Sequence, residues 1–343
     1  MYGGRRLCNI LENVARQHRQ PYRVAMAAPS ARAGSLRPVT RDDLRASVEE
    51  LRRTADPVAG LFGPDSLMWR VNRSTLVYVL GITQAALMDV AHPVIANGIA
   101  DHSRLFTDPH ARAHQTYSMI TTLVFGDRDA VVRTSRALFA RHEKVRGQAR
   151  ADEGVYREGA GYAANEGNVL LWVHATMWWV RLQTWQAVTG PMPAEDKERF
   201  YQETCRLADC FGLPRDLLPA DHDAWDAYVR NGPDGVLSDS DDARRIMAFL
   251  RRSIPAPARA HLLAFNSVVL PDAARTVLDL PPLNARTRRR YRRVLRLLRL
   301  AHRLLPGPLG ELPPYRTAVA RIEGREPDAV TRAVGRVLAG RAA

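Results

Sequence analysis

Hydrophobic residues recur three or four positions apart along most of this chain, and strict alternation of polar and apolar residues is nearly absent. The first pattern is typical of amphipathic helices and the second of half-buried strands. Capping residues stand where such helices should begin, at Thr40, Asp108 and Asp127, and glycines stand where two of them should end, at Gly147 and Gly212. The pattern therefore predicts an all-α fold, a single bundle of about ten helices.

The predicted helices follow one another through short polar connections. They cover residues from Thr40 to about 56, 74–92, a stretch that ends near Phe106, 108–126, 127–147, 168–190, 192–212, 221–233, 241–254 and 285–305. Residues 148–167 are polar and glycine-rich, which predicts a loop. We expect residues 1–40 to form a flexible basic segment, residues 41–325 to form the helical domain, and residues 326–343 to be a short tail.

Positive charge is concentrated near the C-terminus. Residues 281–343 contain fifteen arginines, no lysine and four acids, a net charge of +11, whereas the other 280 residues carry only +3. The helix predicted at 285–305 carries nine of these arginines and the apolar positions Leu295, Leu298 and Leu305. Two interpretations stay open: the leucines pack on the bundle and water covers the arginines, or the helix contacts an anionic membrane or nucleic acid.

Three observations bear on location. Arg5 and Arg6 precede no uninterrupted apolar stretch, so we expect no export signal. Gln84, Asp89 and His92 interrupt the longest apolar region, which is typical of the central helix of a soluble bundle. Three cysteines do not form a disulfide framework, so a cytoplasmic location is expected.

Several enzyme motifs are missing from the sequence. It contains no G-x-S-x-G nucleophile elbow, no P-loop and no H-E-x-x-H zinc site. Ferritin-like di-iron sites need paired E-x-x-H helices, and this chain has only one D-x-x-H, formed by Asp89 and His92. Asp89 could orient the imidazole of His92, although a core histidine at a helix end explains the same pattern.

His142 is the best-placed candidate for a ligand-binding histidine. A path of mostly apolar residues, Val131, Ser135 and Leu138, leads to it at helical spacing. We therefore predict that His142 faces inward. Arg146, one turn later, is expected to share that face and to neutralise an acidic group beside whatever His142 binds.

A second candidate set lies on the preceding helix. Arg112, Gln115 and Thr116 share one stripe, and they form either a hydrogen-bond network at the helix start or a polar site at the end of an apolar seam. His174 stands among apolar residues in LLWVHATMWW, so we expect it to be buried and to have a partner.

The order of several sequence blocks resembles a known family. The blocks are LMDVAHPVIANGIADHSRLFTDPHARAHQTYSMITTLVFGD, RHEKVRG, NEGNVLLWVHATMWW, GLPRDLLP and LPPYRTAVARI. In this order they resemble the haem-dependent oxygenases that include latex clearing protein (rubber oxygenase) and the MpaB-type oxygenases, over residues from about 60 to 325. That family is all-helical, as the hydrophobic pattern also predicts.

The resemblance implies a haem b cofactor whose iron is bound by His142 of the H-x-x-V-R block, with Arg146 and His174 beside the cofactor. Arg112 and Thr116 match the R-x-x-K-T pattern of rubber oxygenases, and they carry over as donors toward oxygen. The resemblance therefore implies a helical bundle that encloses a haem pocket and activates O2 to oxidise or cleave an apolar, isoprenoid or polyketide-like small molecule. No electron donor is indicated.

Two positions depart from the family pattern. Gln115 replaces the lysine, so iron ligation by that lysine is lost, and Asp101 is only a nearby candidate for the distal acid that rubber oxygenases use as a base. With no export signal expected, cleavage of external polyisoprene is not expected. The competing interpretation is a binding protein that acts through the arginine-rich helix.

Overall fold

The computed structural model describes residues 37–339, so the predictions for residues 1–36 and 340–343 fall outside the described part. The helices, in chain order, are α2 (Arg41–Thr54), α3 (Leu67–Asn72), α4 (Thr75–Val90), α5 (Pro93–His102), α6 (Pro109–Phe125), α7 (Arg128–His142), α8 (Gly167–Thr189), α9 (Ala194–Ala208), α10 (His222–Asn231), α11 (Asp241–Ser253), α12 (Ala256–Val269), α13 (Asp272–Val277), α14 (Ala285–Leu304), α15 (Gly307–Gly310), α16 (Pro313–Ile322) and α17 (Ala329–Ala339). Two short 3-10 turns, η1 (Asp209–Phe211) and η2 (Arg215–Leu217), and two strands, β1 (Arg146–Gln148) and β2 (Gly161–Ala163), complete the order. The all-α prediction is confirmed.

The predicted helix starts are confirmed by side-chain caps. The Thr40 hydroxyl accepts from the backbone N–H of Asp43, whose carboxylate accepts from the N–H of Thr40, a reciprocal capping box. The carboxylates of Asp108 and Asp127 cap α6 and α7 in the same manner. These caps satisfy N–H groups that the first helical turn leaves without partners.

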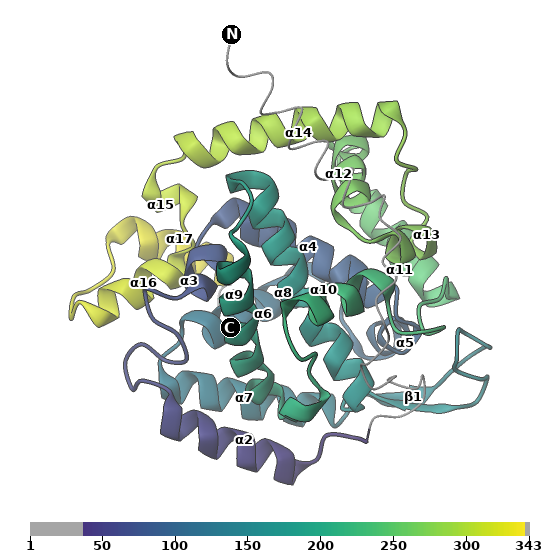
Figure 1. Cartoon of the computed structure of the whole chain (residues 1–343), viewed down its shortest axis with the longest axis horizontal. Coiled ribbons are helices and arrows are strands. Elements are labelled where there is room, and N and C mark those ends of the chain that lie inside the picture. The colour runs from purple at the N-terminus through teal and green to yellow at the C-terminus, as the bar shows by residue number, and fades with distance from the viewer. Residues whose placement is uncertain (1–36, 340–343) are drawn as a thin grey trace. The chain divides into compact units, whose positions relative to one another are not determined.

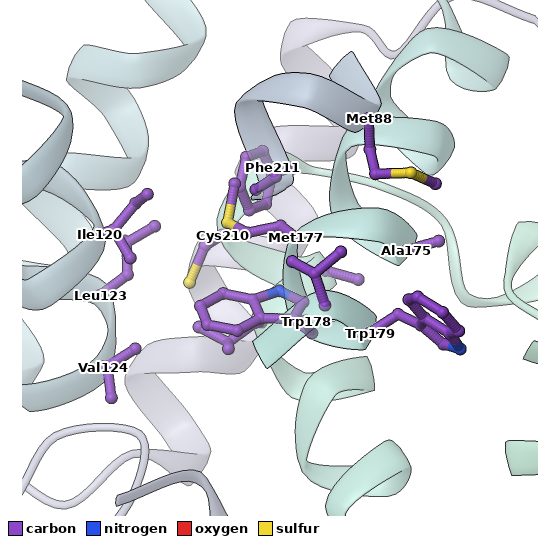
Figure 2. Packing of buried hydrophobic residues seen from close by; sticks show 14 of the residues in the cluster. Met88, Ile120, Leu123, Val124, Ala175, Met177, Trp178, Trp179, Cys210 and Phe211 are labelled. Atoms are coloured by element: carbon purple, nitrogen blue, oxygen red, sulfur yellow. The ribbon is translucent and has the colours of Figure 1, made fainter. Parts of the chain in front are cut away.

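The long helix α8 lies at the centre of the bundle, packed most extensively against α4 (Figure 1). Its buried residues lie on every side of the helix, which explains why its apolar residues do not gather on one face. Figure 2 shows side chains of α6, α8 and η1 turned toward a common interior, among them Ile120, Trp178 and Cys210. Residues from α2, α7 and α9 enlarge the same core.

One predicted helix end is wrong. Helix α7 ends at His142 rather than at Gly147, because residues 146–148 leave the helix and pair antiparallel with residues 161–163. Gly147 allows this hairpin to close, since a Cβ atom there would lie 2.5 Å from the hydroxyl oxygen of Tyr162. The loop predicted for residues 148–167 therefore contains a strand.

The chain also holds more helices than the roughly ten predicted. Helices α3, α12, α13, α15, α16 and α17 had no separate prediction, and most of them are short. Helix α17 lies in the segment expected to be a tail, and it packs against α6 and α16. At the other end, Val39 is buried and its N–H donates to the carbonyl of Asn165.

Within the described residues, no single helix is long and apolar enough to cross a membrane. Helices α4 and α5 meet the length and hydropathy requirement only as a pair, and the two are bent by 105° relative to each other.

Candidate functional site

Four core helices contribute polar side chains to an otherwise apolar interior. We call this set the polar seam: Tyr78 and Asp89 of α4, Arg112 and Thr116 of α6, His142 of α7 and Arg181 of α8. Each member influences at least one other through a hydrogen bond, a ring contact or its charge. Buried polar groups need partners, so this set is the natural place to look for chemistry.

The face of α7 that leads to His142 turns inward, and His142 itself is half-buried at the end of the helix. Val131, Ser135 and Leu138, which precede it on the same face, are buried. Burial lowers the pKa of His142 to about 4, and the positive charges of Arg141 and Arg112 lower it further in the same direction. The ring is therefore neutral at physiological pH and keeps a free lone pair.

An ion pair between α2 and the end of α7 fixes the backbone next to His142. Arg41 donates from Nε to Oε1 of Glu143 at 2.7 Å and from Nη2 to Oε2 at 2.9 Å. This two-pronged geometry gives more directional control than a single contact. Arg146 adds a donor bond from its Nε to the Glu143 carbonyl at 3.1 Å.

Arg112 and Thr116 contact each other, as their spacing predicts. Nη1 of Arg112 donates to Oγ1 of Thr116, which in turn donates to the Arg112 carbonyl at 3.0 Å. Nε of Arg112 donates to Oγ of Ser103 at 3.2 Å. Burial lowers the pKa of Arg112, while the nearby charge of Asp89 acts in the opposite direction. Arg112 is therefore a partly desolvated cation held by neutral groups.

Asp89 is a half-buried acid that lies within electrostatic reach of both Arg112 and Arg181. Burial raises its pKa to about 7, although both arginines act to lower it. Its Oδ1 atom has no hydrogen-bond partner among the described residues. At neutral pH the carboxyl group therefore exists in both its protonated and ionised forms.

Arg181 is a functional candidate that we did not predict from the sequence. It is fully buried in the middle of α8, where its guanidinium carbon lies 4.9 Å from the ring centroid of Trp178 and 5.3 Å from that of Tyr78. The signal was present in the sequence, since Arg181 is the only permanently charged side chain in the 23-residue helix α8. Burial of a charged side chain without a partner raises the free energy of the folded state.

His174 and His92 are both buried, and burial lowers the pKa of each to about 3. The ring of His174 packs edge-on against Phe211 at 6.0 Å, and the ring of His92 lies 5.8 Å from that of Tyr156. Nδ1 of each histidine lacks a partner within residues 37–339. The burial of His174 is confirmed, whereas the expected protein partner is not present in the described part.

Three predicted site residues lie apart from the polar seam. The Arg146 side chain is exposed because α7 ends before it, so the prediction that it shares the face of His142 is wrong. Gln115 is exposed, and it does not lie with Arg112 and Thr116. Asp101 binds Arg150 and accepts from the Tyr162 hydroxyl at 2.6 Å, so it ties α5 to the β2 hairpin.

Two open grooves lie on the surface of the described part of the chain. One, of about 290 Å³, lies between α2 and α7, and the other, of about 310 Å³, lies beside α6 and α16. Neither groove is lined by His142, Arg112 or Thr116. No cluster of three or more His, Cys, Asp or Glu side chains suited to a metal ion occurs among the described residues.

Comparison with known proteins identifies the family. Residues 69–300 match the model of the catalytic domain of the ER-bound oxygenases mpaB/B′ and rubber oxygenase. The chain belongs to this oxygenase family. The match runs from α3 into α14, so the whole polar seam of this MpaB/rubber oxygenase family member lies within the catalytic domain.

Two curated relatives are uncharacterized proteins of Mycobacterium bovis and Mycobacterium tuberculosis. Each is 26% identical to this chain over 235 residues, which is 66% of this chain and 87% of the relative. No solved structure matches the chain. Family membership makes the protein an oxygenase-type oxidoreductase, for which O2 and an oxidisable substrate are the implied partners.

Proposed function

We propose that this family member is a haem b-dependent oxygenase that uses O2 to oxidise or cleave an apolar, isoprenoid or polyketide-like small molecule. The observation that carries the proposal is His142, a neutral imidazole at the end of α7 that lies within electrostatic reach of the Arg112 cation on α6. A histidine that holds haem iron must have such a neutral ring.

The chemistry of the surrounding side chains fits such a cofactor. A haem would need one histidine to hold its iron rather than a cluster of three side chains, and His142 would be that residue. Nδ1 of His174, Oδ1 of Asp89 and two nitrogens of Arg181 are buried without partners among residues 37–339. Buried polar atoms rarely stay unpaired, so their number favours a polar group that enters this interior.

Entry of the cofactor adds a requirement. Neither groove is lined by His142, so we expect side chains or helices around the polar seam to move apart when a macrocycle binds. Interiors are packed to nearly crystalline density, so this rearrangement replaces one set of contacts with another. We therefore expect uptake of haemin to change the stability of the whole bundle.

Within this proposal, the bound haem supplies the redox chemistry toward O2. His142 holds the cofactor in place, and the Arg41–Glu143 ion pair fixes the backbone beside it. Arg112 would favour negative charge that develops on oxygen, and Thr116, which accepts from Nη1 of Arg112, would hold the guanidinium group in position. The apolar walls of α6 and α8 exclude water and contact the substrate.

One spectrum tests the proposal. The full chain is purified, incubated with haemin, reduced with dithionite and treated with carbon monoxide. We expect a strong Soret band that shifts with carbon monoxide and is absent from the His142→Ala variant. A wild-type chain that stays colourless after this incubation would overturn the haem proposal.

The arginine-rich helix supports a second element of the proposal, a peripheral contact with the cytoplasmic face of an anionic membrane. Leu295 is buried and Leu298 is half-buried against the bundle, so those leucines do pack inward. A different stripe faces water: Leu297, Leu300 and Leu304 are 67%, 53% and 70% exposed. They follow one another at spacings of three and four, so they lie on one face of α14.

Exposed arginines flank this leucine stripe on α14, which lies along the upper edge of Figure 1. An exposed apolar stripe beside a cationic face is the pattern of helices that lie on anionic bilayers, where each arginine contributes about 1 kcal/mol. Nucleic acid fits less well, because a phosphate backbone has no use for exposed leucines. An apolar substrate would concentrate in the same bilayer.

Vesicle sedimentation tests the membrane contact. We expect the full chain to bind vesicles that contain phosphatidylglycerol, and the Leu297→Asp/Leu300→Asp variant to bind at least tenfold more weakly. Val58→Asp, at an exposed valine of the loop after α2, is the matched control. The membrane contact would be ruled out if the double variant bound as tightly as wild type, or if wild type bound neutral vesicles as tightly as anionic ones.

A further inference from the structure

Arg181 carries a permanent positive charge in the core without a carboxylate partner. Its side chain is fully buried, and no Asp or Glu oxygen within residues 37–339 lies within 4.0 Å of its nitrogens. Its ring neighbours Trp178 and Tyr78 attract the cation, but they do not neutralise it. A buried charge without a counterion is strongly unfavourable.

The unpaired atoms of Arg181 form one edge of the guanidinium group. Nη1 donates to the Met177 carbonyl at 2.8 Å, whereas Nε and Nη2 have no acceptor among the described residues. Nε and Nη2 lie side by side and point in nearly the same direction. That edge matches the two oxygens of a carboxylate, which accept two parallel hydrogen bonds.

The aromatic rings that lie against the guanidinium group also carry buried polar atoms. The hydroxyl of Tyr78 and Nε1 of Trp178 are buried and unpaired in the described part of the chain. The Tyr117 hydroxyl is unpaired as well, and its ring packs edge-on against that of Tyr78 at 5.5 Å. Within residues 37–339, Asp89 acts on Arg181 only at longer range, so these donors and the cation have no carboxylate in contact with them.

Helix α4 is shaped to accommodate Arg181. Gly81 faces it, and a Cβ atom at position 81 would lie 2.9 Å from Cγ of Arg181. The glycine therefore lets the arginine side chain pass between α4 and α8 and reach Tyr78. Glycine inside a helix costs roughly 1 kcal/mol relative to alanine, so its place here needs a packing reason.

We propose that Arg181 and Tyr78 form a buried binding site for a carboxylate group. One carboxylate neutralises the single charge of Arg181 and fills both free positions on its edge. A phosphate or sulfate dianion would leave an excess negative charge in an apolar interior, which is unfavourable. A neutral ligand would leave the guanidinium uncompensated.

The position of this site suggests what else the ligand carries. Along α4, Gly81 and Asp89 are eight residues apart, which corresponds to about 12 Å of helix. Asp89 interacts with Arg112, whose charge also reaches His142. The carboxylate site at Arg181 and the region around His142 therefore lie at different positions along α4 in the same core. If the proposed oxygenase activity is correct, the substrate is an apolar acid that is anchored at Arg181.

The carboxylate has two possible sources, an acid substrate or a propionate of the porphyrin. The primary test uses calorimetry of the full chain, without haem, with decanoate as the probe and 1-decanol as its neutral control. We expect decanoate to bind at least tenfold more tightly than 1-decanol. The Arg181→Met variant should lose this preference.

Stability separates a binding role from a structural one. Methionine fills a volume similar to that of the arginine stem without the charge, so ligand-free Arg181→Met should unfold at the same temperature as wild type or higher. Arg230 is the matched control, because it lies over Trp179 at 5.1 Å but has a carboxylate partner, Asp226, at 2.6 Å. Arg230→Met should unfold at a lower temperature and bind decanoate normally.

Tyr78→Phe provides a second variant, which keeps the aromatic ring and removes only the hydroxyl group. It should weaken decanoate binding several-fold and leave the unfolding temperature unchanged. Equal decanoate affinity in wild type, Arg181→Met and Tyr78→Phe, together with no effect on haemin, would overturn the carboxylate site and leave Arg181 as a structural residue.

Two porphyrins distinguish the sources of the carboxylate: haemin, and its dimethyl ester, which has no free propionate. The Soret band measures the binding of each. If Arg181 binds a propionate, wild type should prefer haemin by at least tenfold, and Arg181→Met should bind the two alike. If it binds a substrate, both porphyrins should bind equally to both proteins, and decanoate should bind haem-loaded wild type as well as haem-free wild type. Decanoate binding without any haemin uptake would support the carboxylate site and remove the haem proposal.

Discussion

Gly81 of α4 and Arg181 of α8 fit together so closely that a Cβ atom at position 81 would lie 2.9 Å from Cγ of the arginine. Gly81→Ala should therefore displace Arg181 and destabilise the fold, by about 1–3 kcal/mol for an overpacked core. Urea denaturation measures this change. Gly63→Ala is a suitable control, since a Cβ atom there would meet nothing within 4 Å.

Arg181→Met should rescue part of that loss, because methionine can bend away from a Cβ atom at position 81. A double-variant cycle with Gly81→Ala should give an interaction free energy of about 0.5–3 kcal/mol, as is found for residues in contact. Additive effects would show that the two side chains adjust independently.

His142→Ala should abolish retention of haemin by the reconstituted protein while the helical content stays unchanged. His142 is the only histidine of α7, and its ring is neutral, so no other side chain of this helix can replace it as an iron ligand. The pyridine haemochrome spectrum measures the ratio of haem to protein. His110→Ala, at an exposed residue of α6, should retain haem fully.

Arg112→Met and Thr116→Val should leave haemin bound but slow the oxidation of substrate, each by about a hundredfold if it removes one donor to developing negative charge. Gln115→Ala should have little effect, because Gln115 is exposed. Oxygen consumption under single-turnover conditions measures the rate. A large effect of Gln115→Ala would place that residue in the site after all.

Asp89 should make the fold less stable as the pH rises. Burial raises its pKa to about 7 from the usual 3.8, with Arg112 and Arg181 opposing the shift, so its contribution to stability is complete below about pH 4 and is lost as pH rises toward 7. The loss is at most about 4 kcal/mol. Urea midpoints at pH 5 and pH 8 should differ less for Asp89→Asn than for wild type, whereas Asp234→Asn, at an exposed position, should behave like wild type.

His174 should make the fold less stable as the pH falls, which is opposite to the effect of Asp89. Burial lowers its pKa to about 3 from 6.5, so it stabilises the fold above pH 6.5, and this contribution is lost as the pH falls toward 3. His174→Phe keeps an aromatic ring against Phe211 and removes the titration. Its acid-unfolding midpoint should therefore lie at lower pH than that of wild type, while His110→Phe should not shift the midpoint.

Local signals in the sequence predicted the helix starts and the inward face of α7. Thr40, Asp108 and Asp127 cap their helices by contacts within three residues, so sequence alone contains the information. The end of α7 could not be predicted in this manner. It depends on the pairing of residues 146–148 with 161–163 and on the close approach of Tyr162 to Gly147, which are contacts between distant segments.

The same distinction explains the candidate site. Arg112 and Thr116 are one turn apart and were found together from their spacing. Arg181 and Tyr78 come from helices separated by about a hundred residues of sequence, so their contact depends on how α4 and α8 pack. Arg146 was misassigned because the helical pattern was extended past the point where the hairpin begins.

The Arg41–Glu143 ion pair has a practical meaning for the boundaries of the functional unit. Helix α2 precedes the region 69–300 that matches the family, yet it binds the residue next to His142, and Leu44 and Val48 lie buried beneath it. A fragment cut to residues 69–300 would lack α2. It would therefore expose the apolar face of α7 that α2 covers, and it would lose the ion pair next to His142. Biochemical work on the catalytic centre should therefore retain the chain from at least Arg37 onward.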